Sequence, residues 1–72
     1  MEERAELIFK TKAGVKLIFL DTENTCRFVS DNPKAIMSAL KKDSHSSIRE
    51  DRENAEGLLR AINLYGGIEL MN

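Results

Sequence analysis

Two short apolar segments, separated by a loop that contains glycine, place the strongest constraint on how this chain folds. Residues 5–11 and residues 15–21 are rich in the aliphatic, β-branched and aromatic side chains that favour β-strands. Between them lies Lys12-Ala13-Gly14, and glycine adopts a positive φ at little cost, so the spacing predicts a three-residue hairpin loop. The chain is therefore expected to begin with an antiparallel hairpin.

A third strand is expected to extend this hairpin, and a fourth strand is expected near the other end of the chain. Residues 26–30 repeat the strand-like composition after the polar, turn-forming residues 22–25. The first three segments together predict an antiparallel meander. Ile68-Glu69-Leu70 alternates apolar and polar side chains, which predicts a short strand at an edge of the sheet, beside the first or the third strand.

Two helices are predicted between the third and fourth strands. Asp31 and Asn32 are good helix caps and precede a proline at the first helical position, which predicts a helix over residues 33–42. A second helix is expected to open with the Ser-x-x-Glu capping box of residues 47–50 and to stop at Gly66-Gly67. Apolar residues at helical spacing define its inward stripe: Ile48, Ala55, Leu58, Leu59, Ala61, Ile62 and Tyr65.

The element order β-β-β-α-α-β predicts an α+β fold, with a four-stranded antiparallel sheet and both helices packed on one face. A chain of 72 residues accommodates a single domain over residues 1–72, and domains this small often need an added constraint for stability. Cys26 is the only cysteine and His45 the only histidine, which excludes an internal disulfide and a His/Cys zinc site. Association with another chain is then the most available source of extra stability.

The charge balance argues against strongly electrostatic partners. The formal net charge is −1, and acidic and basic residues are interspersed along the chain, so binding to nucleic acid or to an anionic membrane is not favoured. No apolar run approaches the roughly 18 residues of a membrane span. The segment Met1-Glu2-Glu3-Arg4 is acidic where a signal peptide is basic, which indicates a cytoplasmic protein.

Pairing the strands through their loops predicts which side chains share the face of the sheet that meets the helices. A loop at residues 12–14 places Phe9 opposite Leu17, and a loop at residues 22–25 places Phe19 opposite Phe28. This pairing assigns alternate residues of each strand to the same face of the sheet. The core face then carries Leu7, Phe9, Val15, Leu17, Phe19, Cys26 and Phe28.

The other face of the sheet is expected to hold an apolar row with a charged rim. Ile8 is predicted opposite Ile18, and Ile18 opposite Val29, which places three β-branched residues side by side. This arrangement is typical of a protein-binding patch, although β-branched residues also suit exposed strands for structural reasons alone. We predict a protein-interaction module, either a homodimer or an adaptor or inhibitor of a larger protein. The predicted contact residues are Ile8, Ile18, Leu20, Val29, Lys10, Lys16 and Arg27.

No set of residues in the sequence indicates catalysis, a cofactor or a metal, and the chain is not expected to be an enzyme. Cys26 lies in an apolar strand, which predicts a buried and unreactive thiol. Residues 43–47 include the residue types of a hydrolase triad, but five neighbours in one polar loop do not converge as a triad requires. Gly66-Gly67 lacks the strand-to-helix context of a phosphate loop.

Two other classes of function stay open. A nucleic-acid-binding accessory protein would use the basic residues of the first hairpin and the first helix, but the chain lacks tryptophan and an aromatic pair on the open face for stacking bases. A small-ligand carrier or an enzyme would need a site shared between subunits. The basic residues in question are Lys10, Lys12, Lys16 and Arg27 near the hairpin, and Lys34, Lys41 and Lys42 on the first helix.

Overall fold

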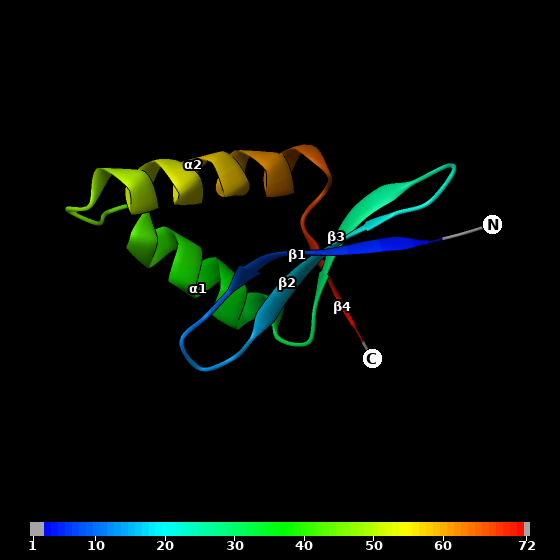
Figure 1. Ribbon diagram of the computed structural model, residues 1–72, viewed down its shortest axis with the longest axis horizontal. Helices are drawn as coiled ribbons and strands as arrows, with labels where there is room; N and C mark the ends of the chain where they lie inside the picture. The colour runs from blue at the N-terminus through cyan, green and yellow to red at the C-terminus, as the bar shows by residue number, and fades with distance from the viewer. Residues whose placement is uncertain (1–2, 72) are drawn as a thin grey trace.

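The computed structural model describes residues 3–71 and contains the predicted order of strands and helices. Two helices form one layer and a four-stranded sheet forms the other (Figure 1). Met1, Glu2 and Asn72, including half of the acidic N-terminal segment, lie outside the described residues. The elements are β1 (Arg4–Lys10), β2 (Lys16–Asp21), β3 (Cys26–Ser30), α1 (Pro33–Asp43), α2 (Arg49–Leu64) and β4 (Ile68–Leu70).

The fold is α+β as predicted, but the sheet is mixed rather than wholly antiparallel. The strand order is β1-β2-β3-β4, and β4 pairs with β3 in parallel, with Phe28 opposite Ile68. In Figure 1 the chain leaves the end of β3, passes through α1 and α2 across the sheet, and returns to enter β4 beside β3. Parallel neighbours require such a crossover. The prediction of an antiparallel last strand was therefore wrong, because it ignored the path of the two helices.

The meander has the predicted loops, and the predicted register between β2 and β3 is confirmed. Phe19 lies opposite Phe28 and Ile18 opposite Val29. At the first loop, the backbone N–H of Gly14 donates to the carbonyl of Thr11 at 3.0 Å, and Gly14 has φ of 91°. A residue with a side chain rarely adopts that φ, so the glycine is needed where the sequence places it.

A β-bulge changes the register in the N-terminal half of β1. Phe9 lies opposite Leu17 as predicted, but Leu7, rather than Ile8, lies opposite Ile18. Ile8 is the extra residue of the bulge, and both Ile8 and Phe9 pack against the hydrophobic core. The predicted faces of Leu7 and Ile8 were therefore wrong. The bulge lets two consecutive apolar side chains meet the helices, and it leaves Leu7 54% exposed on the opposite face.

The core forms where the helices cover β2 and β3. Three aromatic rings extend it towards the end of α2, since the centroid of Phe19 lies 5.0 Å from that of Phe28 and 5.5 Å from that of Tyr65. Tyr65 was predicted on the inward stripe of α2, and its ring does contact the sheet, although 45% of the residue stays exposed. The buried core residues are Leu17, Phe28, Ile36, Leu40, Ala55 and Ile62.

The two helices begin in different ways. Asn32 caps α1 as predicted, because its side-chain oxygen accepts a hydrogen bond from the backbone N–H of Ala35 at 3.2 Å. The predicted capping box of α2 was wrong: the cap position is Ile48, and no side chain caps the helix. Instead, the Ser46 hydroxyl accepts from the Ile48 backbone N–H, and Ile48 is 58% exposed rather than part of the inward stripe. Among the described residues, no helix has the length and apolar character to cross a membrane.

Candidate protein-binding face

The side of the sheet that the helices leave uncovered is called the outer face here. Strand register places Leu7 and Ala5 of β1 beside Ile18 and Leu20 of β2, and Val29 of β3 beside Ile18. This is the apolar row that the sequence predicted, with Leu7 in the place of Ile8. Arg27 and Glu69 share the outer face, as do Lys10 and Lys16 at the end next to the first loop.

The apolar row is less exposed than predicted at one end and more exposed at the other. Val29, between Ile18 and Glu69 in the sheet, is only 4% exposed, although it does not belong to the main core cluster. Ile18 and Leu20 are half-buried. Leu7 supplies the largest exposed apolar side chain of the outer face. Leu7 is therefore the most accessible large apolar side chain of the row, with the half-buried Ile18 and Leu20 beside it.

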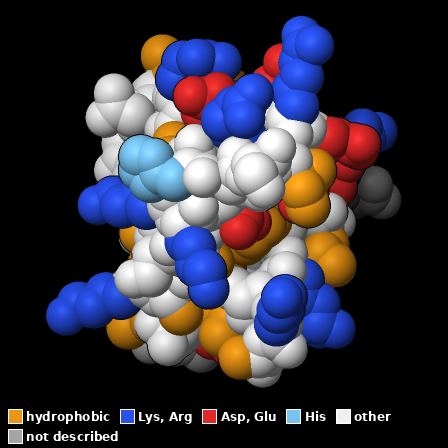
Figure 2. All heavy atoms as spheres, turned by 90° about the vertical axis from the view of Figure 1, so that its left-hand side faces the viewer, with side chains coloured by type: hydrophobic (Ala, Val, Ile, Leu, Met, Phe, Trp, Pro, Cys, Tyr) orange, Lys and Arg blue, Asp and Glu red, His pale blue; other side chains and the backbone are white. Residues whose placement is uncertain are grey.

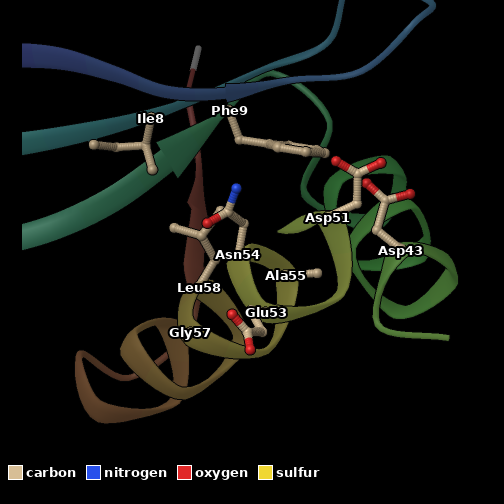
Figure 3. A pocket seen from close by; sticks show the side chains of 9 residues that line it. All are labelled: Ile8, Phe9, Asp43, Asp51, Glu53, Asn54, Ala55, Gly57 and Leu58. Carbon is tan, nitrogen blue, oxygen red and sulfur yellow. The ribbon is translucent and has the colours of Figure 1, made fainter. Parts of the chain in front are cut away.

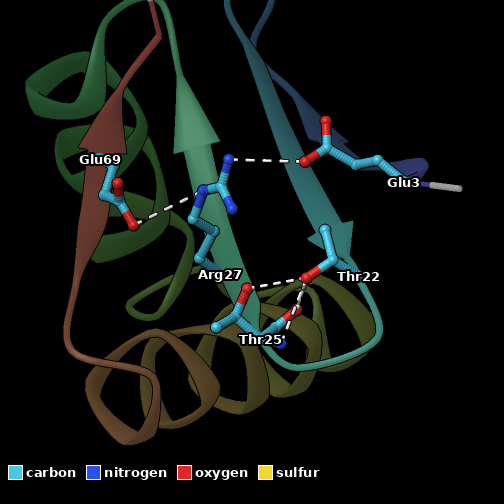
Figure 4. Close-up of polar contacts among 5 residues, drawn as sticks. All are labelled: Glu3, Thr22, Thr25, Arg27 and Glu69. Carbon is cyan, nitrogen blue, oxygen red and sulfur yellow. Dashed lines mark hydrogen bonds and ion pairs between the residues drawn. The ribbon is translucent and has the colours of Figure 1, made fainter. Parts of the chain in front are cut away.

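Arg27 is the middle one of three charged side chains, with Glu3 just before β1 on one side and Glu69 of β4 on the other (Figure 4). Its guanidinium lies 3.5 Å from the Glu3 carboxylate and 3.8 Å from that of Glu69. Arg27 lies opposite Leu20, whereas the predicted basic partners Lys10 and Lys16 are at the other end of the outer face. The predicted basic cluster around the first hairpin therefore lacks Arg27, whose charge is already shared between two acids.

The two ends of the outer face differ in charge. Lys10 and Lys16 lie directly opposite each other, and like charges in that position repel. At the other end, Arg27 lies between the carboxylate of Glu3 and that of Glu69, which reaches Arg27 from its position beside Val29, so the three side chains carry an excess of one negative charge. The outer face thus has an apolar middle, a positive end and a negative end.

The one cysteine is exposed, so the prediction that it is buried was wrong. Cys26 lies opposite Asp21 at the end of the β2–β3 hairpin, beyond the cover of the helices. Its thiol donates a hydrogen bond to Asp21 Oδ1 at 3.3 Å. This bond raises the pKa of the Cys26 thiol above its ordinary value, and desolvation and the Asp21 charge act in the same direction. A thiol held protonated in this way is a poor nucleophile.

Two serine hydroxyls of the 43–47 loop form hydrogen bonds with the backbone. The Ser44 hydroxyl donates to the carbonyl of Lys41 at 2.6 Å, and the Ser46 hydroxyl accepts from the backbone N–H of Ile48. His45 is exposed and forms none of the side-chain hydrogen bonds found among residues 3–71. Over the same described residues, no three histidine, cysteine, aspartate or glutamate side chains are grouped closely enough to hold a metal ion.

Two open grooves border the helices, and neither was predicted from the sequence. One, of about 540 Å³, lies between the bulge of β1 and the first half of α2. The other, of about 690 Å³, lies between α1, α2 and β4, around Met37 and Leu59. Both depend on how helices cross strands, so no local sequence signal marks them. Comparisons of the chain with protein-family models, with curated proteins and with solved structures find no match.

Proposed function

We propose that this protein is a small protein-interaction module that associates with a second copy of itself through the outer face. The observation that carries the proposal is Leu7, a leucine 54% exposed on the uncovered side of the sheet, next to the half-buried Ile18 and Leu20. An apolar centre with charged surroundings is the arrangement of protein interfaces. The same chain would otherwise keep this row in contact with water.

The charges of the outer face favour a second copy as the partner. A two-fold axis that lies between two outer faces, parallel to the sheets and perpendicular to the strands near Ile18, would stack the faces with their strands reversed. Lys10 and Lys16 of one copy would then lie over the end of the other copy that carries Glu3. Each charged end would meet an end of opposite sign, while the apolar rows would cover each other.

Association of this kind is expected to be weak and dependent on salt. Full burial of an aliphatic side chain contributes about 1.5–3 kcal/mol, but Val29 is already buried and two others are half-buried. The loss of translational and rotational freedom opposes what remains. Attraction between exposed charged ends is screened by salt. The dimer should therefore form at high protein concentration and weaken as salt rises.

Sedimentation equilibrium over a range of protein concentrations tests the proposal. The wild type should approach twice its monomer mass of 8.1 kDa, while Leu7→Asp should stay monomeric at the same concentrations. Leu7 is suited to this test because its exposure allows a charge without loss of the fold. Ile18→Asp should give the same result if circular dichroism shows that it folds.

Leu64→Asp is the matched control, since it also replaces an exposed leucine by aspartate but lies on α2, on the other side of the sheet. It should dimerise like the wild type. A wild type that remains monomeric at every concentration would refute self-association. Equal loss of the dimer in Leu64→Asp and Leu7→Asp would show that the outer face is not the interface.

A further inference from the structure

The groove between β1 and α2 combines an apolar floor with an acidic end. Ile8 and Phe9 of the bulge face Ala55 and Leu58 of α2 across it (Figure 3). Its volume of about 540 Å³ falls in the range of about 300–1,000 Å³ that is usual for binding sites. Figure 2 shows the end of the molecule at the α1–α2 connection, where acidic and apolar side chains border a hollow and lysine and arginine side chains project around it.

One wall of this groove is an edge strand with free backbone groups. β1 pairs with β2 on one side only, because the strand order begins with β1. An edge strand exposes N–H and C=O groups that an extended peptide can pair with. The bulge at Ile8 lies in this stretch, so the edge is irregular beside the groove and regular over Arg4–Leu7.

The opposite wall carries a polar side chain suited to an extended backbone. Asn54 is exposed on α2, and Figure 3 shows its amide directed towards β1. It takes part in none of the side-chain hydrogen bonds found among residues 3–71. A carboxamide offers both donors and an acceptor, so it can bond the N–H and the C=O of a peptide that lies between α2 and β1.

The charge of the groove selects the kind of peptide. Asp43 and Asp51 lie together at the end next to Phe9 (Figure 3), and neither forms an ion pair with another described residue. Glu53 is also at the rim, but it already pairs with Arg49 at 2.9 Å. No basic side chain lines the groove. Ile8 and Leu58 provide apolar surface away from the two aspartates.

We propose that this groove binds an extended peptide segment in which an aliphatic residue is followed or preceded, two positions away, by lysine or arginine. Alternate residues of an extended chain point to the same side, about 6.6 Å apart. The aliphatic side chain lies against Ile8 and Leu58, and the basic side chain reaches Asp43 and Asp51. This site lies on the helix side of the sheet and does not depend on self-association through the outer face.

The test is a titration of the ¹⁵N-labelled protein with acetyl-Lys-Ser-Val-Ser-Lys-amide, which presents the motif in either chain direction. Amide shifts are expected at Ile8, Phe9, Asn54 and Leu58 and should saturate with one binding constant. The twin peptide acetyl-Glu-Ser-Val-Ser-Glu-amide should bind at least tenfold more weakly. Asp43→Asn and Asp51→Asn should each weaken binding by about twofold to fivefold, as expected for exposed ion pairs.

Asn54→Trp should fill the groove and weaken binding at least tenfold, whereas Glu56→Trp, a matched bulky change on α2 outside the groove, should leave it within twofold. Leu7→Asp should also leave it within twofold, which separates this site from the outer face. Equal binding of both peptides, shifts confined to the outer face, or no effect of Asn54→Trp would overturn the proposal. So would groove shifts that follow protein concentration without peptide, since the occupant would then be a second copy.

Discussion

Leu7 lies directly opposite Ile18 on the outer face, while its neighbour Ile8 packs towards the helices. One extra residue in β1 exchanges the faces on which these two side chains lie, and this exchange has two consequences. It gives the outer face its most exposed large apolar side chain, and it brings Ile8 to the wall of the groove beside α2. The bulge therefore contributes to both surfaces for which we propose binding.

The bulge predicts that truncating two neighbouring side chains lowers the free energy of unfolding by unequal amounts. Ile8→Ala should lower the free energy of unfolding by about 1–3 kcal/mol, because Ile8 packs against the core. Leu7→Ala should cost less than about 1 kcal/mol, since half of that side chain is already in water. Urea denaturation followed by circular dichroism measures both. The reverse order would mean that β1 pairs with β2 without a bulge.

The two helix starts predict different responses to alanine. Asn32→Ala removes the side-chain cap of α1 and should cost about 1 kcal/mol of stability. Ser47→Ala should change stability by less than about 0.5 kcal/mol, because Ser47 caps nothing in α2. Thermal unfolding at one protein concentration compares the two variants. A loss of stability in Ser47→Ala as large as that in Asn32→Ala would show that Ser47 does cap α2.

The aromatic cluster predicts that Tyr65 holds the end of α2 against the sheet. Tyr65→Ala removes ring contacts with Phe19 and Phe28, at 5.5 and 5.8 Å between centroids, and should cost about 1–3 kcal/mol. Leu64→Ala is the neighbouring control and should be close to neutral, because Leu64 is 80% exposed. Denaturant unfolding distinguishes them. Similar costs for both variants would mean that the cluster contributes little.

The hydrogen bond to Asp21 predicts how the reactivity of Cys26 depends on pH. Because this bond raises the pKa of the thiol, the thiolate fraction below that pKa is smaller than in an unbonded cysteine. Asp21→Asn removes the carboxylate, so the pKa should fall and alkylation by iodoacetamide at pH 8 should become faster. The midpoint of the rate–pH profile should move to lower pH. Glu23→Gln, a neutralised carboxylate in the adjoining loop, should leave the profile unchanged.

Local signals in the sequence determined the elements themselves. The glycine of the first loop, the polar loop before Cys26 and the caps of α1 each act on the backbone within a few residues, so their effects follow from composition and spacing. The register between β2 and β3 follows as well, because a loop of given length leaves one pairing that keeps Phe19 and Phe28 on the same face.

Tertiary structure alone decided which surfaces these elements present. The run Leu7-Ile8-Phe9 is apolar throughout, so alternation could not show that the helices would draw in both Ile8 and Phe9 and leave Leu7 outside. The direction of β4 depends on the position at which α2 ends, and the groove depends on how α2 packs across β1. These features arise from packing between segments far apart in the sequence, and the residue pattern of each segment is compatible with more than one such arrangement.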